Sequence, residues 1–120
     1  MNKLGAAAAL TGFLAVAFGA FGAHALEPSF SPEQADWWKT GTQYALGHSV
    51  AALGIAISGR TGWLRSGGWA FIAGILIFGG TLYALALGAP RWTGAITPIG
   101  GVSFLAGWAF CALGALRENP

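Results

Sequence analysis

A long apolar run without any charged residue, Leu4 to Leu26, most constrains what this chain can fold into. A helix needs about 20 apolar residues to cross the hydrocarbon core of a bilayer, so this run is long enough to span one. Its one strongly polar side chain is His24, close to the C-terminal end of the run. Similar apolar segments recur three times along the chain. The sequence therefore predicts an integral membrane protein whose main partner is the lipid bilayer.

The composition excludes several classes of soluble protein. Of the 120 residues, 55% are apolar and 8% are charged, against roughly 25% charged residues in ordinary soluble domains. The six basic residues stand singly and form no patch, so we expect no nucleic-acid partner. The single cysteine, Cys111, excludes a disulfide framework and a CxxC pair.

The first apolar run also has features of a secretory signal. Lys3 precedes it, and the small residues Ala23 and Ala25 flank His24, which gives the pattern of a cleavage site. The apolar part is longer than the roughly 7 to 15 residues that are usual in such signals. We therefore expect the run to be retained as a membrane helix.

Helix start and stop signals divide the chain into four helices. Ser31, Pro32 and Gln34 have the types and spacing of a capping box with proline at the first helical position. Pro90 ends one apolar run, and Pro98 lies in the first turn of the next. The predicted helices cover about residues 4–26, 32–58, 69–88 and 96–116 of a single domain, 1–120. Short connections favour antiparallel neighbours, so the predicted fold is all-α, an up-down bundle of four transmembrane helices.

The basic residues predict the orientation of the bundle. Those on the side of the two termini are Lys3, Arg60, Arg65 and Arg117, and those on the other side are Lys39 and Arg91. Loops on the cytoplasmic side of a membrane carry an excess of Lys and Arg. We therefore expect a multi-pass protein of the bacterial inner membrane with both termini in the cytoplasm.

Three of the predicted helices carry two glycines that are seven residues apart. This spacing keeps both glycines on nearly one face of a helix, and in lipid such a stripe lets a neighbouring helix pack at close range. The pairs are Gly12 with Gly19, Gly47 with Gly54, and Gly107 with Gly114. We expect all three stripes to face neighbouring helices.

The predicted topology gathers most intramembrane hydrogen-bonding side chains in the outer leaflet. The candidate residues are His24, Tyr44, His48, Thr81, Tyr83 and Thr97. Polar groups in lipid cost free energy unless they find partners, so we expect these side chains to face inward and bond one another.

Two interpretations of this cluster stand side by side. Two histidines with tyrosine hydroxyls could bind a small molecule, ligate a metal or haem, or pass protons. Alternatively, the same residues could form a polar clasp that only holds the helices together. Metal ligation has little support, because no third ligand and no motif of the CxxCH or HExxH kind accompanies the histidines.

Motifs for catalysis are missing from the sequence. The serines lack a GxSxG context, and the glycine-rich pieces lack the GxxxxGK pattern of a phosphate-binding loop. Four short helices packed on glycine also leave little room for a pore. We therefore expect no catalytic residue, metal site or cofactor, and no enzymatic activity.

Four segments in order carry a resemblance to a known family. They are Gly19–His24, Trp38–Gly41 with Tyr44 and His48, Phe78–Leu87, and Thr97–Trp108. Together they resemble the family known as domain of unknown function 423, small bacterial inner-membrane proteins related to the eukaryotic transmembrane protein 256 group. One departure is Gly79-Gly80-Thr81, where the family more often has a Gly-Ser pair before Leu-Tyr. The resemblance implies the fold and the location and carries no activity.

Two functions remain as hypotheses. The first is a non-enzymatic structural or accessory protein that packs in the membrane with itself, as a homo-oligomer, or with a larger complex. The alternative is a protein that binds or transports a small molecule or ion through the outer-leaflet histidines and tyrosines.

Overall fold

A computed structural model of the chain describes residues 1–117, and nearly all of this backbone is helical. Helix α1, Lys3–Phe21, continues into a π-helical turn, η1, Gly22–Leu26. Helix α2 covers Pro32–Ser58. Helix α3, Trp63–Gly74, the π-helical turn η3, Ile75–Gly79, and helix α4, Gly80–Ala86, follow one another and form what we call the third rod. The last helix, α5, covers Thr97–Leu116, and the short 3₁₀ turns are η2, Glu27–Ser29, and η4, Arg91–Ala95.

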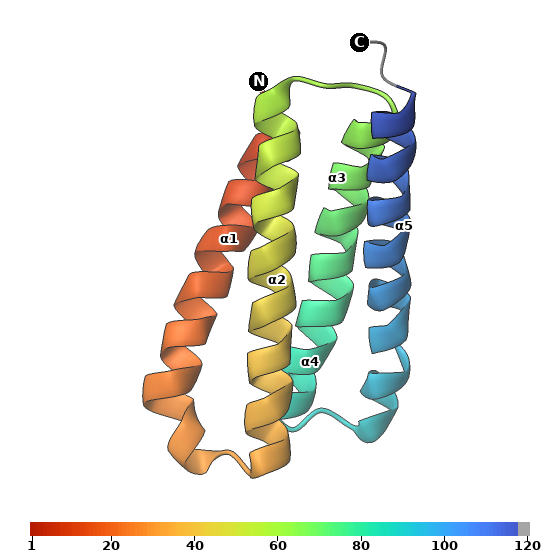
Figure 1. The fold of residues 1–120 in the computed structure, drawn as a ribbon. Coiled ribbons are helices and arrows are strands. Elements are labelled where there is room, and N and C mark those ends of the chain that lie inside the picture. The colour runs from red at the N-terminus through yellow and green to blue at the C-terminus, as the bar shows by residue number, and fades with distance from the viewer. Residues whose placement is uncertain (118–120) are drawn as a thin grey trace.

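The helices run up and down, so that each is antiparallel to the next (Figure 1). The N-terminus and the end of α5 lie at the same end of the molecule. Helices α1 and α5 are outermost in this view, with α2 and the third rod between them. Helix α1 packs mainly on α2, and α5 packs mainly on α3 and η3. The all-α fold is therefore as predicted, and α2 and the third rod form its centre.

Local sequence signals explain where α2 begins and ends. The Ser31 hydroxyl accepts a hydrogen bond from the backbone N–H of Gln34, and the Gln34 side chain accepts one from the Ser31 N–H. The predicted capping box is therefore confirmed. Gly59 ends the helix with a φ of 71°, in the left-handed region that favours glycine.

The start of the third rod differs from the prediction. The apolar stretch predicted that the helix begins at about residue 69, whereas α3 begins at Trp63. Gly62, with a φ of 68°, turns the chain just before that residue. The first turns of α3 carry Arg65, so this helix extends past the apolar stretch that the prediction used.

Three helical segments within residues 1–117, and not four, are long and apolar enough to cross a membrane. They are Lys3–Ser29, Trp63–Ala86 and Arg91–Leu116. By length and composition, three of the four predicted transmembrane helices are therefore found, and α2 is not among them. Helix α2 falls short because it combines charged residues in its first turns with polar residues such as Gln43 and His48 further along. The central position of α2 explains this composition, because the neighbouring helices bury its side chains Trp38, His48 and Ser49.

Small side chains make up much of the core. Leu4 and Phe71 are the largest side chains that are fully buried. The contact between α1 and α2 is lined by alanines, which are Ala8, Ala15, Ala45, Ala52 and Ala56. Short side chains let two helix backbones approach closely, and dispersion contacts between close backbones stabilise helix packing in lipid.

Glycines allow the close approach of α3 and α5. A Cβ on Gly107 would lie 2.6 Å from the Phe71 ring and 3.0 Å from the carbonyl oxygen of Gly67. A Cβ on Gly74 would lie 3.1 Å from the carbonyl oxygen of Gly100. Gly114 lies near the backbone nitrogen of Leu64, which a Cβ would approach to 3.0 Å. Larger residues at these positions would therefore push the two helices apart.

The glycines of α1 and α2 behave differently from each other. A Cβ on Gly12 would meet Ser49 at 3.6 Å, and one on Gly19 would meet Thr42 at 3.0 Å. By contrast, nothing lies within 4 Å of a Cβ built on Gly47 or Gly54. The predicted packing role of Gly47 and Gly54 within the bundle is therefore wrong. The face of α2 that packs inside the protein carries Gly41, Ala45, Ser49, Ala52 and Ala56 instead.

Candidate functional site

His48 uses both of its ring nitrogens, one within α2 and the other to join α2 to α5. Nδ1 lies 2.7 Å from the carbonyl oxygen of Tyr44, one turn earlier in α2. The indole Nε1–H of Trp108 on α5 donates to Nε2 across 3.0 Å. A carbonyl only accepts and an indole N–H only donates, so these partners fix a neutral ring with its proton on Nδ1. Both nitrogens are thus used inside the protein.

Aromatic rings enclose the imidazole of His48. It stacks on Phe104 with the ring centroids 3.8 Å apart, and it meets Phe71 edge-on at 5.2 Å. The Tyr44 ring lies nearly parallel to the imidazole, with the centroids 5.9 Å apart. His48 is 8% exposed, whereas Tyr44 is 46% exposed. This environment resembles a packed polar contact more closely than an open ligand site.

A second polar contact holds α2 to α4. The Thr42 hydroxyl lies 3.0 Å from the carbonyl oxygen of Trp38 and 2.8 Å from the Tyr83 hydroxyl. Because the carbonyl can only accept, Thr42 donates to it, and Tyr83 in turn donates to Thr42. The ring of Tyr83 packs on Trp38 with the centroids 4.4 Å apart.

Trp38 extends this contact to α1. Its indole Nε1–H donates to the carbonyl oxygen of Phe18 across 2.8 Å. The indole lies directly against Gly22 in η1, where any Cβ would overlap it. The Gly22 position therefore requires glycine for this close approach, which places the π-helical turn against α2.

The third polar contact lies between the third rod and α5. The hydroxyls of Thr81 and Thr97 are 2.7 Å apart. The Thr81 hydroxyl donates to the carbonyl oxygens of Ile77 and Phe78, at 2.7 Å and 3.2 Å, so it accepts from Thr97. This contact ties α4 to the first turn of α5.

The six candidate residues therefore do not form one site. His48 and Tyr44 lie with Trp108, Tyr83 lies with Thr42, and Thr81 lies with Thr97. His24 is exposed on η1. Within residues 1–117 it makes no hydrogen bond to another side chain, and no group of three His, Cys, Asp or Glu residues is placed to hold a metal ion.

Several hydrogen-bonding residues of these contacts were missed by the sequence analysis. Thr11 on α1 and Ser49 on α2 are buried with their hydroxyls 2.8 Å apart, and Ser103 on α5 donates to the carbonyl oxygen of Ala70 at 2.7 Å. Trp108 was not among the candidate residues either. A single polar residue in a long apolar helix was the signal that could have found each of them, because such a group needs a partner in lipid.

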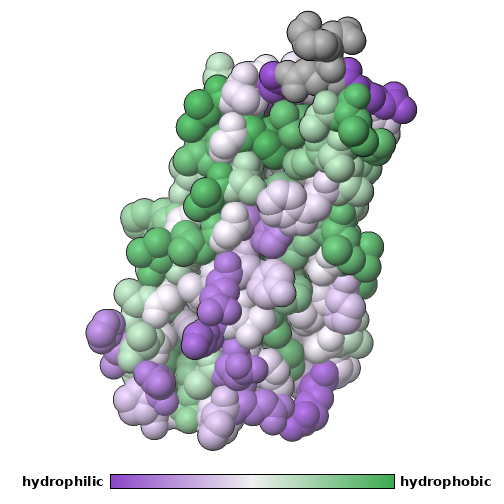
Figure 2. Space-filling view, in the orientation of Figure 1, coloured by the Kyte–Doolittle hydropathy of each residue, from purple (hydrophilic) through white to green (hydrophobic). Residues whose placement is uncertain are grey.

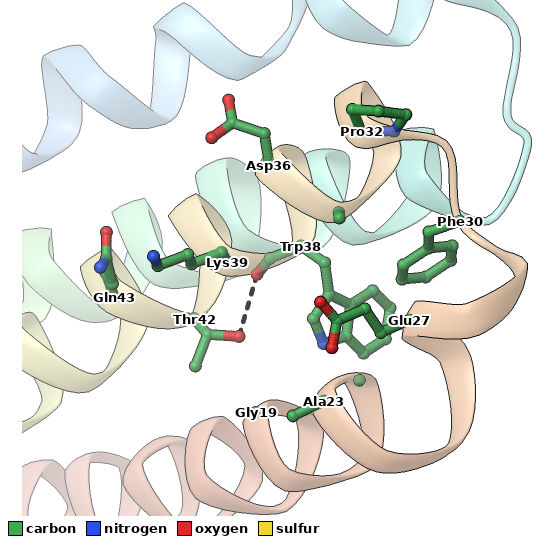
Figure 3. Close-up of a pocket in the computed structure, with 12 residues that line it drawn as sticks. Gly19, Ala23, Glu27, Phe30, Pro32, Asp36, Trp38, Lys39, Thr42 and Gln43 are labelled. Atoms are coloured by element: carbon green, nitrogen blue, oxygen red, sulfur yellow. Dashed lines mark hydrogen bonds between the residues drawn. The ribbon is translucent and has the colours of Figure 1, made fainter.

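A groove opens beside these contacts, between the end of α1 with η1 and the first half of α2 (Figure 3). We call it the α1–α2 groove. Its volume is about 560 Å³. The residues used below that line it are Gly19, Ala23, Glu27, Phe30, Trp38 and Lys39. It lies at the end of the molecule away from the two termini.

The groove lining combines two carboxylates, Glu27 and Asp36, and an ammonium group with apolar walls. Glu27 and Lys39 both line it, and both are exposed. Among residues 1–117 they form no ion pair with each other or with another residue. The ion pair at this end of the protein joins Arg91 and Glu33 at 3.7 Å, outside the groove lining.

Comparison with known proteins shows close relatives in bacteria. The model of a family described as "Protein of unknown function (DUF423)" matches residues 18–101. The UPF0382 inner membrane protein YgdD of Escherichia coli K12 is 42% identical over 113 residues, which cover 92% of this chain and 86% of that protein. A UPF0382 membrane protein of Haemophilus influenzae is 40% identical over 122 residues, covering 98% and 97%.

A further bacterial relative has a similar likeness. A UPF0382 membrane protein of Staphylococcus saprophyticus is 43% identical over 114 residues, covering 91% of this chain and 92% of that protein. No solved structure matches the chain. Since the family model matches more than half of the chain and these relatives match almost all of it, the chain belongs to the DUF423 family of membrane proteins.

Proposed function

We propose that the protein is a non-enzymatic structural component of the bacterial inner membrane that associates with a second copy of itself through α2. The observation that carries this proposal is the uncovered outer face of α2. Gln43, Gly47, Val50 and Gly54 are all exposed on it. In Figure 2, hydrophilic residues reach from the lower end of the molecule up over the front, where α2 lies in Figure 1.

A polar side chain such as Gln43 on this face is costly in a helix that contacts lipid. The amide of Gln43 has two donor hydrogens and an acceptor oxygen, and no group within residues 1–117 forms a hydrogen bond with it. Hydrocarbon offers no partner either, so an intramembrane amide favours contact with another protein surface. This cost favours a protein partner that places polar groups beside Gln43 at the same depth in the membrane.

A second copy meets these requirements. In a parallel pair related by a two-fold axis along the membrane normal, equal positions of α2 come together, so each Gln43 amide meets the same amide of the other copy. An amide both donates and accepts and is therefore complementary to itself. Gly47 and Gly54 have open space around them and allow the two backbones to approach closely. In this arrangement, the seven-residue spacing of the two glycines places both of them in the contact between the copies.

The same proposal includes the topology. We infer that α2 crosses the membrane beside the three more apolar helices, because it runs antiparallel to its neighbours over its whole length (Figure 1). An excess of basic residues at the end with the termini supports a cytoplasmic location for that end. The name of the Escherichia coli relative supports the inner membrane as the location.

The alternative function, handling of a small molecule or ion through the histidines and tyrosines, has less support. Both nitrogens of His48 have partners inside the protein, and His24 lies apart from the other candidates on η1. The hydrogen bonds of Tyr83, Thr81 and Thr97 also join helix to helix. A structural use of these residues requires no ligand.

Cysteine cross-linking in native membranes tests the proposal. In a Cys111→Ala background, Gly47→Cys should form a disulfide-linked dimer under mild oxidation. Val102→Cys is the matched control, because Val102 is 63% exposed on α5, away from α2. Gly47→Leu should shift the protein in mild detergent from dimer to monomer in light scattering. Equal cross-linking at residues 47 and 102, or a wild-type protein that is monomeric in membranes and detergent, would overturn the proposal.

A further inference from the structure

The α1–α2 groove has the size and position of a binding site for part of a lipid. Its volume of about 560 Å³ lies within the range of roughly 300 to 1,000 Å³ that is typical of small-molecule sites. It lies at one end of the helices, beside the short turn η2 that connects α1 to α2 (Figure 3). In a membrane-spanning bundle, helix ends and connecting turns meet the headgroup region.

We propose that this groove binds the headgroup of a zwitterionic phospholipid that carries a primary ammonium, of the phosphatidylethanolamine type. Glu27 would accept hydrogen bonds from the ammonium, and Lys39 would donate to the phosphate. Gln43 lines the groove and also belongs to the exposed α2 face proposed above for self-association, so the two sites adjoin at this residue.

The charges of the groove favour a ligand with both signs. Glu27 and Lys39 line the same cavity but are not paired with each other. Figure 3 shows the Glu27 carboxylate beside Trp38, above Gly19 and Ala23, while Lys39 extends along α2. Asp36 also lines the groove, but its side chain points away from α1 in the same view, whereas the Glu27 carboxylate lies near the Gly19 and Ala23 floor. One zwitterion can neutralise both charges at once, whereas a simple anion or cation neutralises one.

The apolar lining suits the part of the lipid next to its headgroup. The rings of Phe30 and Trp38 both line the groove, with their centroids 5.8 Å apart. Gly19 and Ala23 form a floor with almost no side-chain atoms, which leaves room for a glycerol backbone and the first methylenes of an acyl chain. The indole N–H of Trp38 already donates to Phe18, so the ring presents its apolar surface.

The hydrogen-bond donors of the headgroup distinguish the candidate lipids from one another. A primary ammonium donates up to three hydrogen bonds to a carboxylate, and charge-assisted bonds of this kind are the stronger class. The quaternary ammonium of phosphatidylcholine carries the same charge but has no N–H. Phosphatidylglycerol has the phosphate and lacks the cation. The groove should therefore rank the three lipids with phosphatidylethanolamine first.

Native mass spectrometry of the detergent-solubilised full chain with defined short-chain lipids tests this ranking. We expect phosphatidylethanolamine to bind about tenfold more tightly than phosphatidylcholine, as for the loss of one charge-assisted hydrogen bond at a partly exposed site. Glu27→Gln should abolish that preference, and Lys39→Gln should weaken all three phospholipids. Glu33→Gln is the matched control, because it removes the same charge from a residue outside the groove lining.

A filling variant keeps the test independent of the charges. Ala23 is exposed in the groove, so Ala23→Leu should fit without disturbing the core and should lower binding of every lipid. Equal binding of the three lipids by the wild type, or a Glu27→Gln variant that keeps the preference, would overturn the proposal. Gly47→Leu should leave lipid binding unchanged, so that a failure of this proposal is distinguishable from a failure of self-association.

Discussion

The indole of Trp108 donates a hydrogen bond to Nε2 of His48 across 3.0 Å and thereby joins α5 to α2. These two residues are far apart in the sequence, and each has a polar group that lipid cannot satisfy. The bond also selects the neutral form of the histidine, because a protonated Nε2 has no lone pair to accept it. A structural role for this pair makes a clear prediction about stability.

Trp108→Phe should destabilise the protein. The variant keeps an aromatic ring against Phe71 but leaves Nε2 of His48 without its donor. Leaving a buried acceptor unsatisfied costs about 1 to 3 kcal/mol in the free energy of unfolding. Reversible unfolding in mixed detergent micelles, followed by circular dichroism, measures this change. Trp92→Phe is the control, since Trp92 is 67% exposed, and an equal effect of both variants would contradict the role of the His48 bond.

Tyr83→Phe and Thr42→Val should each weaken the contact between α4 and α2. Both variants keep most of the side-chain volume and remove one hydroxyl of the 2.8 Å pair. Each should lower the free energy of unfolding by about 0.5 to 1.5 kcal/mol. The double variant should lose less than the sum, because both substitutions remove the same interaction. Strictly additive effects in the same unfolding assay would show that the two hydroxyls do not interact.

Gly107→Ala should be far more harmful than Gly101→Ala. A Cβ at residue 107 would lie 2.6 Å from Phe71, whereas nothing lies within 4 Å of one at residue 101. Overpacking of this kind costs about 1 to 3 kcal/mol. Alanine at residue 101 should instead stabilise α5 by up to about 1 kcal/mol through its helix propensity. Thermal unfolding of the two variants in one detergent compares them directly, and similar melting temperatures would contradict the close approach of α3 and α5.

Gly22→Ala should displace Trp38. The added methyl would overlap the indole, so the ring would have to leave the carbonyl oxygen of Phe18. We expect a loss of about 1 to 3 kcal/mol, from the broken hydrogen bond and the disturbed packing of η1 on α2. Accessibility of Trp38 to an aqueous quencher, in a variant whose other tryptophans are replaced by phenylalanine, should rise. An unchanged accessibility would argue against this contact.

Much of the helical structure was predictable because its signals are local. The capping box at Ser31 and Gln34 needs only neighbouring residues, and the prolines limit helices wherever they occur. Gly47 and Gly54 show the limit of such signals. Their spacing placed them on one face, but the spacing cannot say whether that face meets a helix of the same chain or lies open.

The partners within the polar contacts were less predictable. In α5, apolar residues occur on every side, so the sequence pattern does not fix how the helix is rotated about its axis. The contact between Trp108 and His48 depends on that rotation, and so does the pairing of Thr81 with Thr97. The sequence therefore pointed to some of the residues that needed partners, and it did not show which residues most of them meet.

The π-helical turn η3 gives the third rod two different neighbours along its length. Before the turn, α3 packs against α5 and α2, and after it, α4 packs chiefly against α2. Residues within a π-helical turn advance around the axis by less than in an α-helix, so the turn changes the angular phase between the two halves. Deleting one residue between Ile75 and Gly79 would restore regular winding but would break that phase relation. The third rod could then no longer place its glycines against α5 and, at the same time, the Tyr83 hydroxyl against Thr42.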